Sequence, residues 1–197
     1  MIVGICGPIN SGKDTVADIL CNEFNFLRVA FADSLKDFCL RMFPDILDEE
    51  TLWGPSEKRT PKCRHLLQQL GTDVARQFDP DVWVKHTMNR IGLLQHQGLD
   101  ALGRHLPTKP NRSIVVSDVR FLNEAEGIRA QGGFLLSITR PDNYDLVNTE
   151  QAARTHKSET SIFEIPPELF TDHIVNNKTL EDLRIQTQEV LLGLLKP

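Results

Sequence analysis

Short apolar runs alternate with amphipathic helical patterns along the chain. Residues 1–6 are almost wholly apolar, as expected of a strand that is buried on both faces. A helix is predicted over residues 13–24, because four apolar side chains recur on one of its faces. A second strand is predicted over residues 27–32. This alternation is typical of a largely parallel α/β sheet.

The rest of the chain continues the alternation. Further helices are predicted over residues 34–43, 64–76, 82–95 and 121–131, and further strands over 113–117, 134–139 and 173–176. Irregular connections are expected at 44–62, 98–112 and 142–167. Thr179 is expected to cap a last helix whose apolar face includes Leu183 and Val190.

Five strands with covering helices predict a single α/β domain over residues 1–197. The expected core consists of residues 1–33, 113–140 and 168–197. Two excursions leave this core: an arm over 34–95, followed by a connecting loop over 96–112, and a second arm over 141–160. We expect both arms to cover a site on the core.

The composition excludes several classes of protein. The 197 residues are 40% hydrophobic and 25% charged, which is ordinary for a globular domain. The formal net charge of −5 argues against a protein that binds a nucleic-acid polymer over a basic face, but it allows a local cationic pocket for a phosphate ligand. No apolar run approaches the roughly 18–20 residues of a membrane span, and we expect no signal peptide and no membrane partner.

The four cysteines indicate a reducing compartment. Cys6, Cys21, Cys39 and Cys63 lie far apart and form no Cys-x-x-Cys pair. In a chain of this size without a leader, they are expected to be reduced, mostly buried thiols. We therefore expect a cytoplasmic protein.

The most informative segment lies between the first strand and the first helix and reads Gly-Pro-Ile-Asn-Ser-Gly-Lys-Asp-Thr over residues 7–15. A Gly, four residues and then Gly-Lys form the phosphate-binding loop pattern. Glycines let the backbone curl until N–H groups converge on phosphate oxygens, and the helix N-terminus and the lysine add positive charge. We predict an ATP site formed by Gly7, Asn10, Ser11, Gly12, Lys13, Asp14 and Thr15. The alternative is a glycine turn that only joins strand to helix.

Asp14 departs from the usual pattern. It stands where Ser or Thr normally binds Mg²⁺, and the hydroxyl follows one residue later, in Thr15. A displaced Thr is similar to the Gly-Lys-Gly-Thr of nucleoside-monophosphate kinases. Asp14 and Thr15 are therefore candidate Mg²⁺ ligands. Alternatively, Asp14 is a first-turn acid that only favours the helix N-terminus.

A second candidate group closes the strand at 113–117, where Ser117, Asp118, Val119 and Arg120 follow an apolar run. An acid at the carboxyl end of an interior strand lies at the edge of the sheet where α/β sites are built. Asp118 is a candidate to hold Mg²⁺ water or to orient the attacking phosphate, with a helix N-cap as the alternative. Arg120 is a candidate phosphate clamp or a structural partner of Glu124. The predicted catalytic set is Lys13, Asp118, Arg120 and Arg140.

Transfer between two phosphates requires cations that neutralise their repulsion. The two arms supply Lys58, Arg59, Lys62, Arg64, Arg76, Arg140, Arg154, His156 and Lys157. Arginines at element boundaries are favoured, because guanidinium groups suit phosphate geometry, whereas any other single cation is more often solvated surface. Trp83 and Phe38 are candidates to stack on a base, with core packing as the default interpretation.

Several motifs, taken in their order and spacing, resemble the bacteriophage deoxynucleoside-monophosphate kinases. They are Gly-Lys-Asp-Thr at 12–15, Phe-Ala-Asp-Ser-Leu-Lys at 31–36, Leu-Leu-Gln-Gln-Leu-Gly-Thr-Asp-Val-Ala-Arg at 66–76, Asp-Val-Trp-Val at 81–84, Ser-Asp-Val-Arg-Phe-Leu-Asn-Glu at 117–124 and His-x-Ser-Glu at 156–159. Val-Asn-Asn at 175–177 is similar to the last strand of that group.

The resemblance implies a P-loop kinase fold whose five-stranded parallel sheet has the order 2-3-1-4-5. It also implies transfer of the ATP γ-phosphate to a deoxynucleoside 5′-monophosphate with Mg²⁺; the deoxy sugar rests on the family alone. Residues 34–95 would then be an acceptor-binding arm and 141–160 a lid that closes, with Arg140, over the phosphates. The acceptor-binding set expected on this basis is Asp33, Lys36, Arg64, Gln68, Thr72, Arg76, Trp83 and Glu159.

Two alternatives stay open. Another small-molecule P-loop kinase, acting on dephospho-coenzyme A or phosphomevalonate, would share the loop and the sheet. A nucleotide-dependent switch would bind nucleotide without an acceptor. A GTPase switch would need Asn-Lys-x-Asp, and the segment 177–180 has Leu at the Asp position. The accepted bases, the selectivity for ribose and the formation of a homodimer are also left open.

Overall fold

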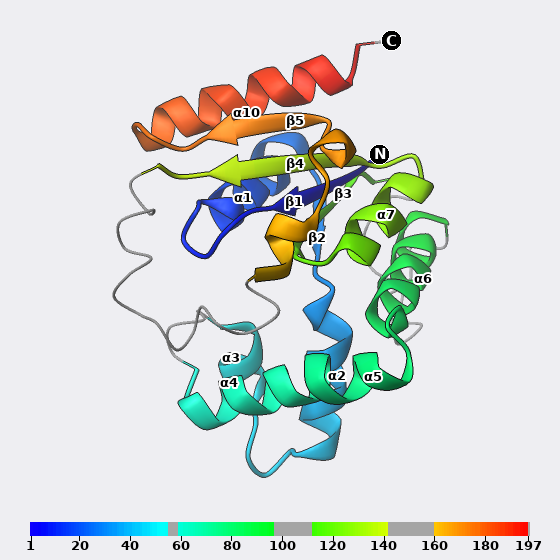
Figure 1. The fold of residues 1–197 in the computed structure, drawn as a ribbon. Coiled ribbons are helices and arrows are strands. Elements are labelled where there is room, and N and C mark those ends of the chain that lie inside the picture. The colour runs from blue at the N-terminus through cyan, green and yellow to red at the C-terminus, as the bar shows by residue number, and fades with distance from the viewer. Residues whose placement is uncertain (55–58, 97–111, 142–159, 197) are drawn as a thin grey trace. The chain divides into compact units, whose positions relative to one another are not determined.

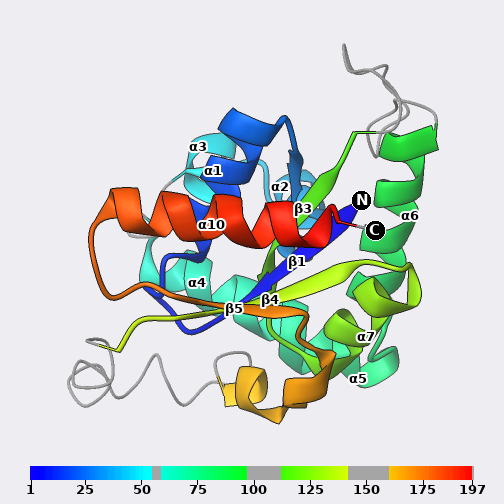
Figure 2. The same ribbon diagram turned by 90° about the horizontal axis from the view of Figure 1, so that it is seen from above.

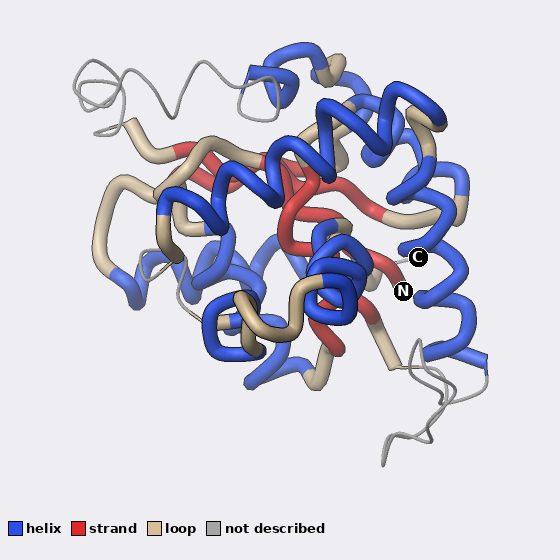
Figure 3. Tube along the Cα trace, turned by 90° about the horizontal axis from the view of Figure 1, so that it is seen from below, coloured by secondary structure: helices blue, strands red, loops and turns tan. Residues whose placement is uncertain are grey.

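The computed structural model describes residues 1–54, 59–96, 112–141 and 160–196. These residues form two compact units, one made of Met1–Ala30 and Met88–Pro197 and the other of Phe31–Thr87. The structure contains helices and strands (Figure 3), and several helical elements follow one another in the described parts of residues 32–96. None of the helices within these described ranges is long and apolar enough to cross a membrane.

The first unit is built on a five-stranded sheet (Figure 1). The strands are β1 (Ile2–Cys6), β2 (Leu27–Val29), β3 (Ile114–Val119), β4 (Phe134–Thr139) and β5 (Asp172–Val175). Their order is β2-β3-β1-β4-β5, and every neighbouring pair is parallel. The structure therefore confirms the predicted fold class and strand order.

Helices cover both faces of this sheet (Figure 2). On one face, α1 (Lys13–Phe24) and α10 (Leu180–Leu194) pack against each other and share a buried cluster with Val3 and Ile5 of β1. On the other face, α7 (Leu122–Ala130) approaches so closely that a Cβ on Gly4 would lie 2.5 Å from Ile128 Cδ1. β1 is buried on both faces, as its apolar sequence predicts.

Local sequence signals explain where α1 begins and ends and where α10 begins. α1 begins after Gly12 and ends at Asn25, which has a left-handed φ of 58°, so the predicted bounds are confirmed. Thr179 caps α10 as predicted: its side chain accepts a hydrogen bond from Asp182 N, and the Asp182 carboxylate accepts one from Thr179 N.

The second unit is helical. Its elements are α2 (Ala32–Met42), α3 (Glu49–Trp53), α4 (Pro61–Gln68), the π-helix η2 (Gln69–Val74), α5 (Ala75–Phe78) and the beginning of α6 (Val82–His96). They enclose a small core centred on Leu35, Cys39, Leu47, Leu52 and Cys63. Trp83 packs against this core, as the default interpretation predicts, whereas Phe38 is 48% exposed, so core packing was the wrong expectation for it.

Several predicted boundaries are wrong. β2 ends at Val29, and the helix after it begins at Ala32 instead of residue 34. The expected irregular stretch 44–62 contains α3, whose N-cap Asp48 accepts a hydrogen bond from Thr51 N at 2.7 Å. The helix predicted over 64–76 begins at Pro61, behind the capping residue Thr60, and changes to a π-helix before it continues as α5.

Two further differences concern the second half of the chain. β3 continues to Val119, two residues beyond its predicted end. The segment 142–167 was expected to be irregular; 142–159 lies outside the described residues, and the remainder contains the 3₁₀ helix η3 (Ser161–Glu164) and the start of η4 (Pro167–Leu169). All four cysteines are free, and three are buried, as predicted.

Candidate active site

The loop between β1 and α1 is shaped by close backbone packing. A Cβ on Gly7 would lie 2.9 Å from Ser11 Oγ and closer still to the backbone carbonyl oxygen of Ile138 on β4. Gly12 has a φ of 102°, which side chains rarely allow, and a Cβ there would lie 2.5 Å from Asn176 Nδ2. The two glycines of the phosphate-binding pattern therefore stand where larger residues would distort the curl.

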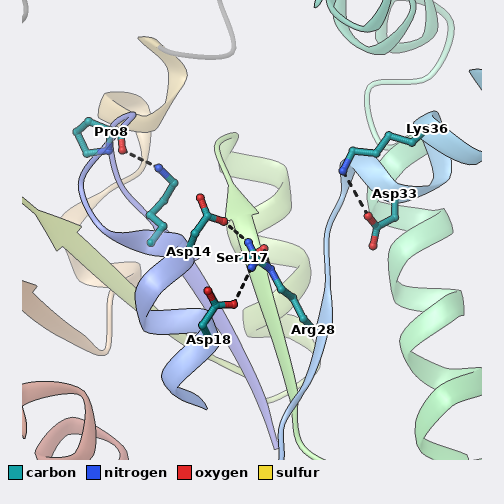
Figure 4. A network of polar contacts seen from close by, with 8 residues as sticks. Pro8, Asp14, Asp18, Arg28, Asp33, Lys36 and Ser117 are labelled. Atoms are coloured by element: carbon teal, nitrogen blue, oxygen red, sulfur yellow. Dashed lines mark hydrogen bonds and ion pairs between the residues drawn. The ribbon is translucent and has the colours of Figure 1, made fainter. Parts of the chain in front are cut away.

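Three hydrogen bonds hold the loop in its curled form. Lys13 Nζ donates to Pro8 O at 2.6 Å (Figure 4), and Ser11 N donates to the same oxygen at 3.2 Å. Asn176, just after β5, donates through Nδ2 to Ser11 O at 3.0 Å. The carbonyl groups of Pro8 and Ser11 are thus engaged within the protein, so the backbone curl that an anion site requires is fixed by the protein's own contacts.

The hydroxyl of Ser11 fits a phosphate ligand. Ser11 is 1% exposed, and its Oγ has no hydrogen-bond partner among the described residues. A buried hydroxyl without a partner costs free energy, and a bound phosphate oxygen would accept its hydrogen bond. This orphaned group lies inside the segment that the sequence assigns to ATP.

Asp14 takes part in a network centred on Arg28 of β2 (Figure 4). Arg28 Nη2 contacts Asp14 Oδ1, Nη1 donates to Asp18 Oδ1 at 3.1 Å, and Nε donates to Ser117 Oγ at 3.0 Å. One guanidinium group therefore joins the first two turns of α1 to the end of β3. The structure gives Asp14 a cationic partner, and its role as a Mg²⁺ ligand stays a prediction.

Asp118 and Arg120 lie at the carboxyl end of β3, beside the start of the phosphate loop, since Cys6 of β1 pairs with Val119. The N-cap alternative for Asp118 is wrong, because α7 begins at Leu122 behind the N-cap Phe121. Glu124 fixes this turn: its buried carboxylate accepts hydrogen bonds from Arg120 N at 2.8 Å and from Phe121 N at 3.1 Å.

The positive charges of Lys13 and Arg120 both act on the thiol of Cys6, the last residue of β1. Burial raises the pKa of the Cys6 thiol to about 12, and the positive charges of Lys13 and Arg120 act against that rise. The negative charge of Glu124 acts in the opposite sense, so Lys13 and Arg120 add positive charge at an edge of the sheet that also holds a buried carboxylate.

The oxygen groups around the loop fit a Mg²⁺ ion that is held mainly by nucleotide phosphates. Such an ion takes one or two protein oxygens and completes its shell with phosphate and water. Thr15 in the first turn of α1 and Asp118 on β3, both partly buried, are donors of this kind. Within the described ranges, no three His, Cys, Asp or Glu side chains gather as a metal centre of their own.

In the second unit, Asp33 and Lys36 form an ion pair on α2. Asp33 is buried, its Oδ1 lies 3.8 Å from Lys36 Nζ, and both side chains are 13% exposed (Figure 4). Lys36 Nζ also lies 5.8 Å from the centre of the Trp53 ring, in a cation–π arrangement. The carboxylate and the ammonium group are thereby oriented by their own unit.

The expected acceptor residues Gln68, Thr72 and Arg76 follow one another at intervals of four along a single helical run. This run contains the π-helix η2, whose hydrogen bonds join residues five apart. The wider turn brings side chains four positions apart closer to alignment along the axis than an α-helix does. Single π turns occur frequently at functional sites.

Trp83 supports the π-helix from α6. Its Nε1 donates to Gly71 O at 2.7 Å, and a Cβ on Gly71 would lie 2.6 Å from Leu35 Cδ2. The carbonyl of Gly71 therefore has a partner outside the helix. Its missing side chain also lets the helix approach α2.

The other predicted site residues differ in their surroundings. Arg59 donates to two backbone carbonyls of its own unit, Thr51 O at 3.3 Å and Leu52 O at 2.8 Å. Arg64 and Arg76 are held by backbone carbonyls, through Nε to Arg59 O at 3.3 Å and through Nη1 to Pro80 O at 3.2 Å. Arg140 is exposed directly after β4. Residues outside the described ranges are Lys58, Arg154, His156, Lys157 and Glu159.

A comparison with known proteins decides the family. No protein-family model matches the chain. A protein of Acanthamoeba polyphaga mimivirus that bears the name "Putative deoxynucleotide monophosphate kinase" is 32% identical to this chain, in an alignment that covers 94% of this chain and 93% of that protein. The chain belongs to the deoxynucleotide monophosphate kinase family. The resemblance inferred from the motifs is thereby confirmed.

Solved structures of other proteins resemble this chain in their fold. The dephospho-CoA kinase from Campylobacter jejuni has a TM-score of 0.54 at 15% identity, with 98% of this chain and 96% of that chain covered. TT1252 from Thermus thermophilus has a TM-score of 0.52 at 20% identity, covering 100% and 98%. At these identities the likeness concerns the P-loop kinase fold alone.

Two supporting residues of this kinase fold were missed by sequence reasoning. They are Arg28 and Asn176, each of which acts through a contact with a distant segment. Glu124 was expected as a structural partner of Arg120, and its carboxylate accepts a hydrogen bond from Arg120 N. Arg28 left a signal, because it is a charged residue in the middle of the short apolar strand Leu-Arg-Val. Asn176 left none beyond its place in the Val-Asn-Asn motif.

Proposed function

We propose that this chain transfers the γ-phosphoryl group of ATP to the 5′-phosphate of a deoxynucleoside monophosphate, with ADP and a deoxynucleoside diphosphate as products. Membership of the deoxynucleotide monophosphate kinase family supports the substrate class. The observation that carries the proposal is the phosphate loop, curled around Gly7 and Gly12 with Lys13 at its end and the unpartnered Ser11 hydroxyl inside it.

On the donor side, the loop residues 7–15 bind the phosphates of ATP. Backbone N–H groups and the N-terminus of α1 supply a fixed positive potential, and Lys13 exchanges its contact with Pro8 O for phosphate oxygens. Thr15 and Asp118 would hold a Mg²⁺ ion, which would supply positive charge to neutralise the phosphates. Asp118 also orients the attacking phosphate.

On the acceptor side, we assign residues 34–95 of the single kinase domain to an arm that binds the monophosphate. Arg64, Gln68, Thr72 and Arg76 contact the nucleotide, with Asp33, Lys36 and Trp83 near it. Guanidinium groups are suited to the acceptor phosphate because they bind two of its oxygens at once. Residues 141–160, including Glu159, act as a lid.

The chemistry needs charge neutralisation more than proton transfer. The attacking group is a phosphate that is already ionised, so no general base has to remove a proton. Lys13, Arg120 and Arg140 stabilise the negative charge that spreads over the transferring group. Closure of the lid excludes water, which would otherwise accept the phosphoryl group.

The proposal is tested by measuring ADP release with a panel of acceptors at saturating ATP and Mg²⁺. The panel contains the four common deoxynucleoside monophosphates, the matching ribonucleotides, dephospho-coenzyme A and phosphomevalonate. Release that depends on one or more deoxynucleoside monophosphates, with the diphosphate identified as product, is the expected result. A Lys13→Ala preparation controls for contaminating kinases.

Each of the other outcomes of the panel would indicate a different function for this chain. Faster turnover of dephospho-coenzyme A or phosphomevalonate than of every nucleotide would overturn the proposed substrate class. Slow hydrolysis of ATP that no monophosphate changes would indicate a nucleotide-binding switch. We place the enzyme in the cytoplasm; sedimentation of the purified protein decides between a monomer and a homodimer.

A further inference from the structure

Arg28, on β2, contacts side chains of α1 and of β3, the two segments beside the phosphate loop. Its three guanidinium nitrogens contact Asp14, Asp18 and Ser117 (Figure 4). Asp14 directly follows the loop lysine, and Ser117 directly precedes Asp118. Arg28 therefore bridges the two segments from which the donor site is assembled.

The ion pairs of Arg28 contribute little to the stability of the fold. The side chains of Asp14 and Asp18 are 77% and 61% exposed, and that of Arg28 is 37% exposed. Exposed pairs of this kind are typically worth between zero and about 1 kcal/mol. A structural role alone does not explain why a strand of three residues carries an arginine at its centre.

The negative charges of Asp14 and Asp18 give a better reason for an arginine at this position. Without Arg28, the first two turns of α1 would present two carboxylates beside a loop that has to bind a polyanion. Lys13 and Asp14 are neighbours on the helix, so their side chains diverge by about 100°, and Lys13 faces Pro8 O while Asp14 faces Arg28. The positive charge of the loop is thereby separated from the negative charge that follows it.

We propose that Arg28 is a positioning residue that holds the Asp14 carboxylate against β2 and cancels its charge, so that the triphosphate of ATP can bind. This inference rests on the proposed function. It also gives a physical reason for the cation on β2. Asp14 stands where the usual phosphate loop has Ser or Thr, and Arg28 of β2 compensates the charge of this acid.

The arrangement requires arginine and not just a positive charge. Nε is used by Ser117 Oγ at 3.0 Å, while Nη1 and Nη2 serve the two carboxylates. The hydrogen bond to Ser117 fixes the plane of the guanidinium group, and this plane aims the other two nitrogens at α1. The compact ammonium group of a lysine has no such planar fork.

The first test compares Arg28→Gln with the unaltered enzyme. ATP affinity is measured by equilibrium titration without acceptor, and KM for ATP, KM for the deoxynucleotide and kcat are measured separately. We expect ATP binding to weaken roughly tenfold, the effect of one unpaired charge about 10 Å from another in a partly solvated site. The acceptor KM and kcat should stay within about twofold, and the loss should shrink at high salt.

The decisive variant is the rescue. In Arg28→Gln/Asp14→Asn the uncompensated carboxylate next to the loop lysine is gone, and only that of Asp18, one turn further along α1, stays without Arg28. ATP affinity should therefore return to within about twofold of the Asp14→Asn single variant. If Asp14 is instead a Mg²⁺ ligand, Asp14→Asn alone will lower kcat and the double variant will not recover; that result would overturn the inference.

Matched variants separate this effect from general damage. Arg184→Gln removes another arginine that pairs with an acid of α1, Glu23, at 2.6 Å, and it should leave ATP affinity unchanged. Arg28→Lys keeps the charge without the fork, and we expect about a threefold loss of ATP affinity. It also serves as the test if Arg28→Gln does not fold, because Asp14→Asn should then restore Arg28→Lys.

Failure of the inference and failure of the proposed function give different results. If the unaltered protein binds no ATP, the proposed function is wrong. If it binds ATP and phosphorylates deoxynucleotides while Arg28→Gln binds ATP equally well, only the role of Arg28 is wrong. An equal loss of affinity in Arg184→Gln also counts against that role, since it would show a general response of α1.

Discussion

The phosphate loop of the first unit and the helical run of the second unit are built on opposite principles. The loop is shaped by its backbone: Gly7 and Gly12 stand where any Cβ would meet a neighbour, and carbonyls are held by Lys13 and Asn176. The helical run is shaped by side chains, above all by Trp83, which bonds Gly71 O within the π-helix. A site made of backbone tolerates no added atom, whereas a site made of side chains changes gradually.

The largest effect is expected from Lys13→Ala. This variant removes the one positive side-chain charge of the loop and keeps Gly7, Gly12 and two of the three hydrogen bonds that hold its curl. We expect kcat/KM to fall by about a thousandfold while the protein stays folded. Lys85→Ala is the matched control, because it removes an exposed lysine that pairs with Asp79 at 2.7 Å. Near-normal activity in Lys13→Ala would show that the loop is not the donor site.

Gly7→Ala tests the backbone side of the comparison. Its Cβ would lie 2.9 Å from Ser11 Oγ and would also press on the Ile138 carbonyl of β4, so either the loop or β4 must move. We expect a loss of stability of about 1–3 kcal/mol and no measurable ATP binding. Thermal unfolding and ATP titration measure the two losses. Gly132→Ala, where a Cβ meets nothing within 4 Å but φ is 68°, separates backbone strain from crowding.

The same contrast explains which features were predictable from sequence. β1, α1 and the start of α10 were found almost to the residue because their signals are local. These signals are an apolar run, a glycine before a helix, and the capping residue Thr179. The identity of the loop followed from residue spacing alone, since its geometry is a property of the backbone.

The missed features depend on contacts between distant segments. The π-helix requires a donor from Trp83 and a close approach of Leu35, neither of which is visible in the sequence of residues 69–74. The network of Arg28 joins positions 14 and 117, and it becomes apparent only when β2 pairs with β3. α3 was the avoidable miss, because Asp48 followed by two glutamates is a local N-terminal signal.

A smaller effect is expected from Trp83→Phe, which sharpens the side-chain half of the comparison. Phenylalanine keeps most of the packing against the Leu35 cluster and removes the hydrogen bond to Gly71 O, which is worth about 1 kcal/mol. The acceptor KM should rise about fivefold with ATP affinity unchanged.

The matched control for Trp83→Phe is Phe78→Ala, which removes an aromatic ring that is 87% exposed in the same unit. It should leave both KM values unaltered. If Trp83→Phe weakens ATP binding as much as acceptor binding, then the π-helix does not serve the acceptor alone, and the division of labour between the two regions is wrong.

The smallest effect concerns the far end of α1, about 15 Å along the helix from Lys13. Hydrogen bonds from Arg184 and Gln188 lower the pKa of Glu23 below its ordinary value of 4.5. Because the folded pKa is the lower one, Glu23 stabilises the fold at neutral pH, and this contribution is lost as the pH falls from about 4.5 through the folded pKa. The stability difference between the unaltered protein and Glu23→Gln should therefore be present at pH 7, decline below pH 4.5 and leave ATP affinity unaffected. If the stability difference persists unchanged at pH 3, the Glu23 side chain contributes by packing and not by its charge. Charged contacts would then matter only at the end of α1 next to the phosphate loop.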